Sequence, residues 1–357
     1  MVDEPAKTND RTAPAADPAK PDDPTTPAAA DAPPSEKSGS FRTARGSGEK
    51  KGKLPELRLG TGWLPEPPDA RDLTIDHPPL QRMLAKLAVG KLLRKKRLPA
   101  KVDLTQWAGP VWFQGGFNTC NAHVVAGLVA YFEMKAHGNE IAPSRLFLYK
   151  VAKNFLQTTG NSGVYIRQVM GVLKLIGVPP EKYWPYPDPG TYEAPRSSDP
   201  LIEAEPTAFC YAIANDYRAI SYYRLDSTGQ NPEELLRLAK AHLAAQVPFA
   251  FGFPIYQLIA QAKGSGQIAY PSPPLPNLSN HAVIALGYDD DKVVGEGIPG
   301  AATTRGAIRI KNSWGETWGD KGFGWIPYEF ILQGHTRDFW TLLRSEWVDT
   351  GAFQLIS

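Results

Sequence analysis

The sequence predicts an α+β protein, and three observations lead to that class. Segments with helical spacing of apolar residues dominate the first half of the globular region, whereas short apolar runs typical of strands dominate the second half. This segregation differs from the regular alternation of strands and helices that builds a parallel sheet. The chain also carries no internal repeat of solenoid length. Its 357 residues correspond to roughly two folding units.

The first 55 residues differ in composition from the rest of the chain. Residues 1–53 consist mainly of Ala, Pro, Asp, Lys, Ser, Thr and Gly, eight prolines precede residue 40, and Phe41 is the first aromatic residue. Such a segment buries too little apolar surface to offset the entropy lost on ordering. We therefore expect residues 1–55 to form a disordered tail rich in Pro and Ala.

Residues 56–100 are interpreted as an N-terminal extension of the globular region. Ordered structure is expected to begin where large apolar residues first cluster, between Leu57 and Leu64. Over residues 79–97, leucines and Met83 recur at helical spacing, which predicts a short amphipathic helix with a basic face. A dense run of positive charge ends this segment before Pro99 and offers an obvious cleavage site to a protease.

The remaining elements follow from periodicity and from helix-capping residues. Apolar residues at helical spacing predict helices over 119–137, 144–156, 165–175 and 231–245. The last helix begins with Asn231 as the cap and Pro232 in the first helical position. Short apolar runs predict strands over 219–225, 249–253, 281–288, 306–312 and 338–343. A Gly-rich hairpin loop is expected at 289–305.

Composition argues against several classes of protein. The chain has 39 Lys and Arg against 37 Asp and Glu, a net charge of +2, so we expect no nucleic-acid partner. No stretch approaches the ~18 apolar residues of a membrane span. The polar N-terminus lacks the pattern of a secretory signal, so we expect a cytoplasmic protein, with non-classical export left open. Two cysteines are too few for a disulfide scaffold, and Cys210 is expected to be a buried structural thiol.

The segment from Gln114 to Cys120 is the first that suggests chemistry. A cysteine at the start of a long helix feels the positive end of the helix dipole, which predicts a lowered thiol pKa. Gln114 lies six residues upstream across a Gly-rich turn, so its amide and the N–H of Cys120 would form an oxyanion hole. Taken alone, such a cysteine is as readily a small buried hydrophobe. His123 is discounted as a base, because the helix start does not turn it toward the sulfur.

Two later segments supply further candidate residues. His281 opens an apolar strand that ends in Gly287 and Tyr288. Asn312 ends another strand and is followed by Ser-Trp314-Gly and then by a second Trp-Gly pair. The amide oxygen of an asparagine can orient an imidazole, and a neighbouring tryptophan can exclude water from that hydrogen bond. A purely structural role in packing would explain the tryptophans of the two Trp-Gly pairs, but it does not explain the polar residue Asn312 before them.

Together these segments resemble the motif set of the papain-like cysteine peptidases, which is Gln-x5-Cys, His-Ala-Val-x3-Gly-Tyr and Asn-Ser-Trp-Gly-x2-Trp-Gly in that order. The resemblance spans most of residues 60–343 and is greatest to the bacterial branch. It implies a two-lobe fold, with a helical left lobe at 101–205 and an antiparallel, β-barrel-like right lobe at 206–345. The site would lie in the cleft between the lobes, and residues 346–357 would form a C-terminal tail.

The resemblance also implies an activity, the hydrolysis of peptide bonds in a peptide or protein substrate. Cys120 would be the nucleophile, His281 the base and later the acid, and Asn312 the residue that holds the imidazole. Gln114 and the N–H of Cys120 would bind the oxyanion. The scheme needs no cofactor and no metal, and we expect a monomer.

Two further residues carry implied roles in substrate binding. Gly163 matches the glycine whose backbone pairs with an extended substrate, and Trp314 would shield the hydrogen bond between His281 and Asn312. The chain departs from the family pattern around the nucleophile, where it reads Asn118-Thr119-Cys120-Asn121. Phe117 replaces a cysteine that forms a disulfide in many secreted members, which agrees with a reducing compartment.

Alternatives to the peptidase hypothesis stay open. The altered neighbours of Cys120 are compatible with a pseudopeptidase that binds peptides without cutting them, and the same triad serves peptide ligases and aminopeptidases. Family members also commonly carry an N-terminal segment that covers the cleft. Residues 56–100 are therefore interpreted either as such a propeptide, with a mature-like start near Leu98, or as a permanent part of the fold.

Overall fold

The computed structural model describes residues 59–214 and 220–353, and the structural statements below concern these residues. These described residues belong to one compact unit. The tail expected at residues 1–55 lies outside the described residues.

Three helices carry the helical part of this unit, at the positions that the sequence predicts. They are α3 (Cys120–His137), α4 (Arg145–Leu156) and α5 (Ile166–Leu175). Ser144 caps α4, because its hydroxyl oxygen accepts a hydrogen bond of 3.1 Å from the N–H of Phe147. Helix α3 is buried along most of its length and packs against α4, α5 and the sheet. Its nearly continuous burial agrees with the apolar residues on several of its faces, and Asn121, His123 and Glu133 are buried polar residues among them.

The other described helices are shorter or lie nearer the sheet. They are α1 (Pro78–Lys86), α2 (Val89–Arg94), α6 (Ala208–Ile213), α7 (Pro232–Ala244), α8 (Ala262–Ser265), α9 (Glu329–Leu332) and α10 (Ser345–Asp349). The predicted cap of α7 is confirmed, since the side-chain oxygen of Asn231 accepts a hydrogen bond of 2.8 Å from the N–H of Glu233.

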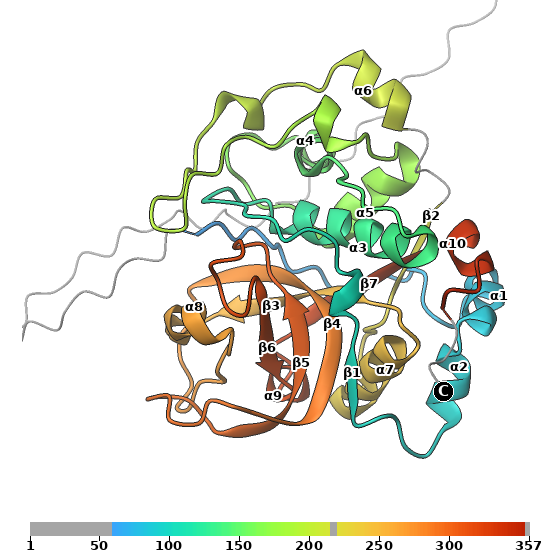
Figure 1. Ribbon diagram of the computed structural model, residues 1–357, viewed down its shortest axis with the longest axis vertical. Coiled ribbons are helices and arrows are strands. Elements are labelled where there is room, and N and C mark those ends of the chain that lie inside the picture. The colour runs from blue at the N-terminus through green and yellow to red at the C-terminus, as the bar shows by residue number, and fades with distance from the viewer. Residues whose placement is uncertain (1–58, 215–219, 354–357) are drawn as a thin grey trace, which may run out of the picture. The chain divides into compact units, whose positions relative to one another are not determined.

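The strands form one antiparallel sheet with the order β2-β7-β3-β4-β5-β6, and β1 pairs with β4 outside this path. They are β1 (Lys101–Asp103), β2 (Ile220–Arg224), β3 (Phe249–Ile255), β4 (Ser279–Val294), β5 (Thr304–Lys311), β6 (Phe323–Pro327) and β7 (Arg337–Arg344). Figure 1 shows the helical part above the strands, with α7 beside β1 and β4. The predicted α+β class is confirmed.

Several boundaries differ from the expectations. The helix predicted over 79–97 is two helices, because the turn after α1 allows Leu87 and Val89 both to be buried, which a continuous helix would place on nearly opposite faces. Strand β4 extends to Val294 and β5 begins at Thr304, so the expected hairpin loop at 289–305 is shorter and its flanks are paired. Part of the expected C-terminal tail is α10, where Trp347 stacks on Phe132.

The N-terminal extension runs over two parts of the unit. Its first described residues pass between the helical part and the strands, where Figure 1 draws them in blue. Helices α1 and α2 then pack against α10 and α7 respectively. The first part of the extension therefore lies at the candidate site, and the second part lies away from it.

Candidate active site

Cys120 begins α3, and its side chain is fully buried. The thiol donates a hydrogen bond of 3.6 Å to Oδ1 of Asn121. Burial raises the pKa of the Cys120 thiol to about 12, and nearby backbone N–H groups, including those of Ala282 and Trp63, oppose this rise only in part. The expectation of a lowered thiol pKa is therefore wrong for this arrangement, because desolvation outweighs the position at the helix start.

His281 and Asn312 are brought together by the β4–β5 ladder. In that ladder Ile284 faces Lys311, so the start of β4 lies beside the residue that follows β5. Nε2 of His281 lies 2.8 Å from Oδ1 of Asn312, and both side chains are buried. With Oδ1 as the acceptor, the Nε2 nitrogen carries the hydrogen. The other ring nitrogen, Nδ1, is buried and has no hydrogen-bond partner within the described residues.

Trp314 lies against the imidazole of this pair. Its ring stacks on the imidazole of His281 with centroids 4.6 Å apart and planes inclined by 22°. Burial lowers the pKa of His281 to about 4, and the hydrogen bond to Asn312 opposes this shift only in part. The thiol of Cys120 and the imidazole of His281 are consequently both neutral near pH 7 in this arrangement.

Gln114 lies next to Cys120, and its amide is held from both ends. Its Oε1 accepts a hydrogen bond of 2.5 Å from the hydroxyl of Ser313, and its Nε2 donates one of 2.6 Å to the carbonyl of Phe117. The same Nε2 lies 3.3 Å from the carbonyl oxygen of Thr61, and the backbone N of Cys120 lies 3.4 Å from that oxygen. Two N–H donors thus converge on one carbonyl oxygen, which is the geometry of an oxyanion hole.

That carbonyl belongs to residues 60–64, which we call the covering segment. Gly60 donates to the carbonyl of Gly115 (2.8 Å), and the indole N–H of Trp314 donates to the carbonyl of Gly60 (3.0 Å). Gly60 and Gly62 are needed for this close approach. A Cβ on Gly60 would lie 2.0 Å from the carbonyl oxygen of Phe117, and Gly62 has a φ of +108°.

The covering segment is also paired to both walls of the site. The N–H groups of Gly62 and Trp63 donate to the carbonyl of Asn280, at 3.2 and 3.3 Å. On the opposite wall, Leu64 donates to the carbonyl of Val164 and Val164 donates to the carbonyl of Gly62, at 3.2 and 3.1 Å. The segment therefore bridges β4 and the residues just before α5.

Gly163, the last residue singled out in the sequence, lies against this segment. A Cβ added to Gly163 would fall 2.6 Å from the carbonyl oxygen of Gly62. The backbone pairing itself is made by the next residue, Val164. Gly163 thus permits an extended chain to approach, which agrees with the expected role without testing it.

Other candidate residues lie apart from the sulfur. His123 is directed elsewhere, with Nδ1 3.0 Å from the carbonyl of Thr119 and Nε2 3.1 Å from Nη1 of Arg145. Cys210 is a buried free thiol, as predicted. Within residues 59–214 and 220–353, no group of three or more His, Cys, Asp or Glu side chains is arranged to hold a metal ion.

Sequence reasoning missed the contribution of Thr61, Trp63 and Asp338 to the site. The indole N–H of Trp63 donates a hydrogen bond of 2.8 Å to Oδ2 of Asp338, 275 positions away in the chain. One signal was available, since Gly60 and Gly62 alternate with Thr61 and Trp63 at the point where large apolar residues begin. Alternating glycines next to a tryptophan are typical of a backbone that approaches another chain closely.

Comparison with known proteins supplies an independent result. The model of the Papain family cysteine protease family matches residues 98–331. The chain is 26% identical over 238 residues to the uncharacterized peptidase C1-like protein L477 of Acanthamoeba polyphaga mimivirus, over 64% of this chain and 68% of that protein. It is 23% identical over 241 residues to cysteine protease 1 of Oryza sativa subsp. japonica, over 66% of this chain and 42% of the rice protein.

A solved structure agrees with this match. Xylellain, a cysteine protease from Xylella fastidiosa, is similar with a TM-score of 0.60 at 29% identity, over 82% of this chain and 98% of that chain. The papain-like fold and the likeness to a bacterial member are thereby confirmed. None of the helices described between residues 59 and 353 has the length and apolar character needed to cross a bilayer. Because the family match covers residues 98–331, well over half of the sequence, the chain belongs to the papain family of cysteine proteases.

Proposed function

We propose that this cysteine peptidase cuts peptide bonds with Cys120 as nucleophile, His281 as base and acid, Asn312 as the orienting residue and Gln114 as an oxyanion donor. One observation carries the proposal. The N–H donors of Gln114 and Cys120 meet at a single carbonyl oxygen, that of Thr61, beside the hydrogen-bonded pair of His281 and Asn312.

The chemistry follows from these residue types. The thiol proton of Cys120 passes to the unpartnered Nδ1 of His281, and the sulfur adds to the substrate carbonyl carbon. The negative charge that develops on the carbonyl oxygen is stabilised by the two N–H donors. His281 then gives its proton to the leaving amine as the C–N bond breaks. A water molecule that loses a proton to His281 adds to the thioester, the C–S bond breaks, and the thiol is regenerated.

We also propose that the covering segment restrains this activity. The carbonyl of Thr61 occupies the two donors that a substrate carbonyl needs, and Cys120 has no exposed surface. The raised pKa of Cys120 and the lowered pKa of His281 disfavour an ion pair while both groups are buried. Displacement of residues 60–64 would admit water and substrate together. In this proposal the covering part of the extension is these five residues, and α1 and α2 are permanent parts of the fold.

The test uses a mixed pool of extended peptides and mass spectrometry of the products. The Trp63→Ala variant, which loses a large anchoring side chain of the covering segment, should cut the pool faster than the wild type. In that background Cys120→Ala and His281→Ala should abolish cutting, and Gln114→Ala should lower it by roughly 10²- to 10³-fold. Retention of full turnover by Cys120→Ala would contradict the proposed mechanism.

The buried, protonated thiol favours one second candidate, a peptide-binding pseudopeptidase. A thiol-reactive epoxide inhibitor separates the two hypotheses. Labelling of Cys120 in the Trp63→Ala variant together with cleavage of the pool supports the peptidase, whereas peptide binding with neither supports the pseudopeptidase. The products also show whether the enzyme cuts internally, trims ends or joins peptides.

A further inference from the structure

A strongly basic surface lies on α1, α2 and the residues that follow them. Residues 77–102 contain no Asp or Glu, although the chain as a whole has a net charge of only +2. All the Lys and Arg side chains of this stretch are exposed, and two of them form ion pairs, Lys86 with Asp349 and Lys101 with Asp289. The others form no ion pair with a carboxylate of residues 59–214 or 220–353. We call them the basic patch, and they are Arg82, Lys91, Arg94, Lys95, Lys96 and Arg97.

The charges of the basic patch repel one another. Arg82 lies four residues before Lys86 in α1, and Lys91 lies three residues before Arg94 in α2. Like charges at these spacings destabilise a helix. The helix dipole favours a cation in the last turn of each helix, but it does not account for the three further charges at 95–97. A negatively charged partner would offset this repulsion, so the basic patch has the electrostatic character of a binding surface.

A groove of about 450 Å³ lies among these charges, at the edge of the molecule where Figure 1 shows α1 and α2. Lys91 and Arg94 line it together with Gln81 and Gly90. A Cβ built on Gly90 meets no atom within 4 Å, so the groove is open at this point. A ligand that fits the groove carries both negative charge and aliphatic surface, because the rest of the lining is aliphatic and consists of Ile75, Leu84, Ala85, Ala88, Val89 and Leu93.

This combination favours an anionic membrane over a nucleic acid. Single-stranded nucleic acids are held largely by aromatic side chains that stack on the bases, and residues 77–102 contain no Phe, Trp or Tyr. A duplex offers phosphates to the cations but nothing that fills an aliphatic groove. An anionic phospholipid offers a phosphate next to an acyl chain. Clusters of about four to eight Lys and Arg on an amphipathic helix are typical of surfaces that bind such lipids.

We propose that the basic patch and the groove dock this protein on a membrane that contains anionic phospholipids. Headgroup phosphates contact Lys91 and Arg94, and the upper part of an acyl chain enters the groove. The proposal goes beyond the proposed peptidase activity and does not depend on it. Docking would bring the catalytic residues to protein substrates that lie at the membrane surface.

The first test measures binding of the full-length protein to sedimented vesicles. Vesicles of equal parts phosphatidylcholine and phosphatidylglycerol should bind it at least about 10-fold more tightly than vesicles of phosphatidylcholine alone, because each basic side chain near an anionic surface contributes about fivefold. Binding should disappear in 1 M NaCl, where the Debye length is only about 3 Å. Equal affinity for the two kinds of vesicle, no binding to either, or binding that resists salt would overturn the proposal.

Matched charge variants locate the binding surface. Lys91→Gln/Arg94→Gln should bind the anionic vesicles about 30-fold more weakly, which is about fivefold for each charge removed. Lys174→Gln/Lys182→Gln is the control, because it removes the same charge from two exposed lysines outside the patch and should leave the affinity unchanged.

A second patch variant makes the test independent of the folding of α2. Lys95→Gln/Lys96→Gln changes residues that follow the helix and should also weaken vesicle binding at least about 10-fold. Wild-type affinity in both patch variants would assign the binding to another basic stretch, such as residues 37–58, and reject the proposal. An affinity lost equally in the control would reject it as well.

The groove is tested with a soluble short-chain lipid. By isothermal titration calorimetry, monomeric dihexanoyl-phosphatidylglycerol should bind the wild type at least about 10-fold more tightly than glycerol 3-phosphate, because only the lipid buries aliphatic surface. Gly90→Leu fills the groove without changing the charge and should abolish this preference. Gly264→Leu is the control, because a Cβ there also meets no atom within 4 Å. A preference that survives Gly90→Leu would reject the groove as the lipid site.

A competition experiment separates the membrane from a nucleic acid. Duplex DNA is added to the vesicle-bound protein at the same concentration of phosphate groups as the anionic lipid. We expect most of the protein to remain on the vesicles, since the duplex contacts the cations alone. Release of most of the protein by the duplex would assign the basic patch to nucleic acid and overturn the proposal.

Discussion

The two halves of the N-terminal extension are held by different forces. Residues 60–64 are attached chiefly by backbone hydrogen bonds to Asn280, Val164 and Gly115, with Trp63 as a buried side-chain anchor. Helices α1 and α2 are attached by apolar burial, since Leu80, Leu87 and Leu92 are almost completely removed from water. The first half replaces contacts that an extended substrate is able to make, whereas the second half has no such competitor. The difference agrees with the proposal above, in which residues 60–64 are displaced while α1 and α2 stay in place.

This distinction bears on the two alternatives that the sequence left open for residues 56–100, a propeptide or a permanent part of the fold. The amphipathic stripe, which suggested a propeptide helix, packs on α7 and α10. Arg237 of α7 also holds the end of this segment, because it donates hydrogen bonds to the carbonyls of Leu93 and Lys95, at 2.8 and 2.6 Å. The residues that lie over Cys120 come instead from the covering segment, residues 60–64, which precedes α1. The bounds expected for the N-terminal extension, residues 56–100, stay a prediction.

The largest effect is expected from opening the first half. Trp63→Ala should raise the rate of Cys120 alkylation by iodoacetamide at pH 7.5 by at least ~10²-fold, because solvent access lowers the thiol pKa from about 12 toward its ordinary value. The rate is measured by mass spectrometry of the modified peptide. Gly90→Ala serves as the control and should leave the rate unchanged. A wild-type rate in Trp63→Ala would show that the segment does not restrict the thiol.

A change in the second half should affect stability without opening the site. Leu87→Ala removes a fully buried side chain and should lower the free energy of unfolding by ~2 to 5 kcal/mol. Urea denaturation followed by tryptophan fluorescence measures this loss. At low temperature, where the variant remains folded, the alkylation rate of Cys120 should match that of the wild type. A parallel rise in alkylation would mean that the two halves are released together.

The imidazole should report the same opening. In the covered protein burial holds the pKa of His281 at about 4, so the ring is neutral at pH 5.5. In Trp63→Ala we expect this pKa to rise to ~5 to 6, toward the ordinary value of a histidine, which means that the opened protein binds part of a proton at pH 5.5. Titration of the ring C–H signals by NMR measures the midpoint. An unchanged midpoint alongside a faster alkylation would indicate that the sulfur alone is uncovered.

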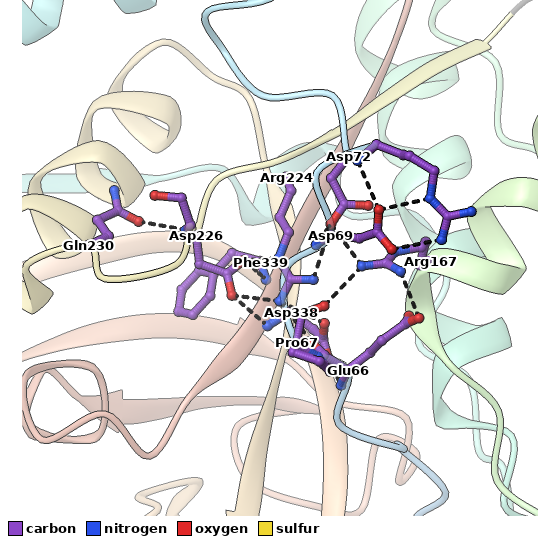
Figure 2. Close-up of polar contacts among 12 residues, drawn as sticks. Glu66, Pro67, Asp69, Asp72, Arg167, Arg224, Asp226, Gln230, Asp338 and Phe339 are labelled. Atoms are coloured by element: carbon purple, nitrogen blue, oxygen red, sulfur yellow. Dashed lines mark hydrogen bonds and ion pairs between the residues drawn. The ribbon is translucent and has the colours of Figure 1, made fainter. Parts of the chain in front are cut away.

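The smallest effect concerns Glu66, which lies two residues after the first half. Glu66 forms a partly exposed ion pair of 2.7 Å with Arg167, and exposed pairs contribute little. Glu66→Gln should raise Cys120 alkylation by no more than about fivefold. Figure 2 shows that Arg167 also contacts Asp72 and Pro67, which remain in this variant. A rise in the alkylation rate as large as that in Trp63→Ala would show that the ion pair, and not the indole, is the main anchor of the covering segment.

Local patterns predicted much of the fold, and the errors occur where a distant contact intervened. Helices α3, α4 and α5 were predictable because apolar spacing and caps are properties of neighbouring residues. Strand β6 was missed, since its residues alternate in burial over only five positions and it is defined by pairing with β5. The prediction of a single helix over 79–97 was wrong, because packing against α7 and α10, which are distant in the sequence, determines where the chain turns.

The sequence by itself determined the identity of the candidate residues, because Cys120, His281 and Asn312 each stand in a short motif whose chemistry depends on immediate neighbours. Only the tertiary structure decided their electrostatic state and their access to substrate. The pKa of Cys120 is raised instead of lowered, because desolvation depends on every chain segment packed around the sulfur, including residues 60–64. The acceptor beneath Trp63 likewise comes from Asp338, a residue that no local pattern connects to the start of the chain.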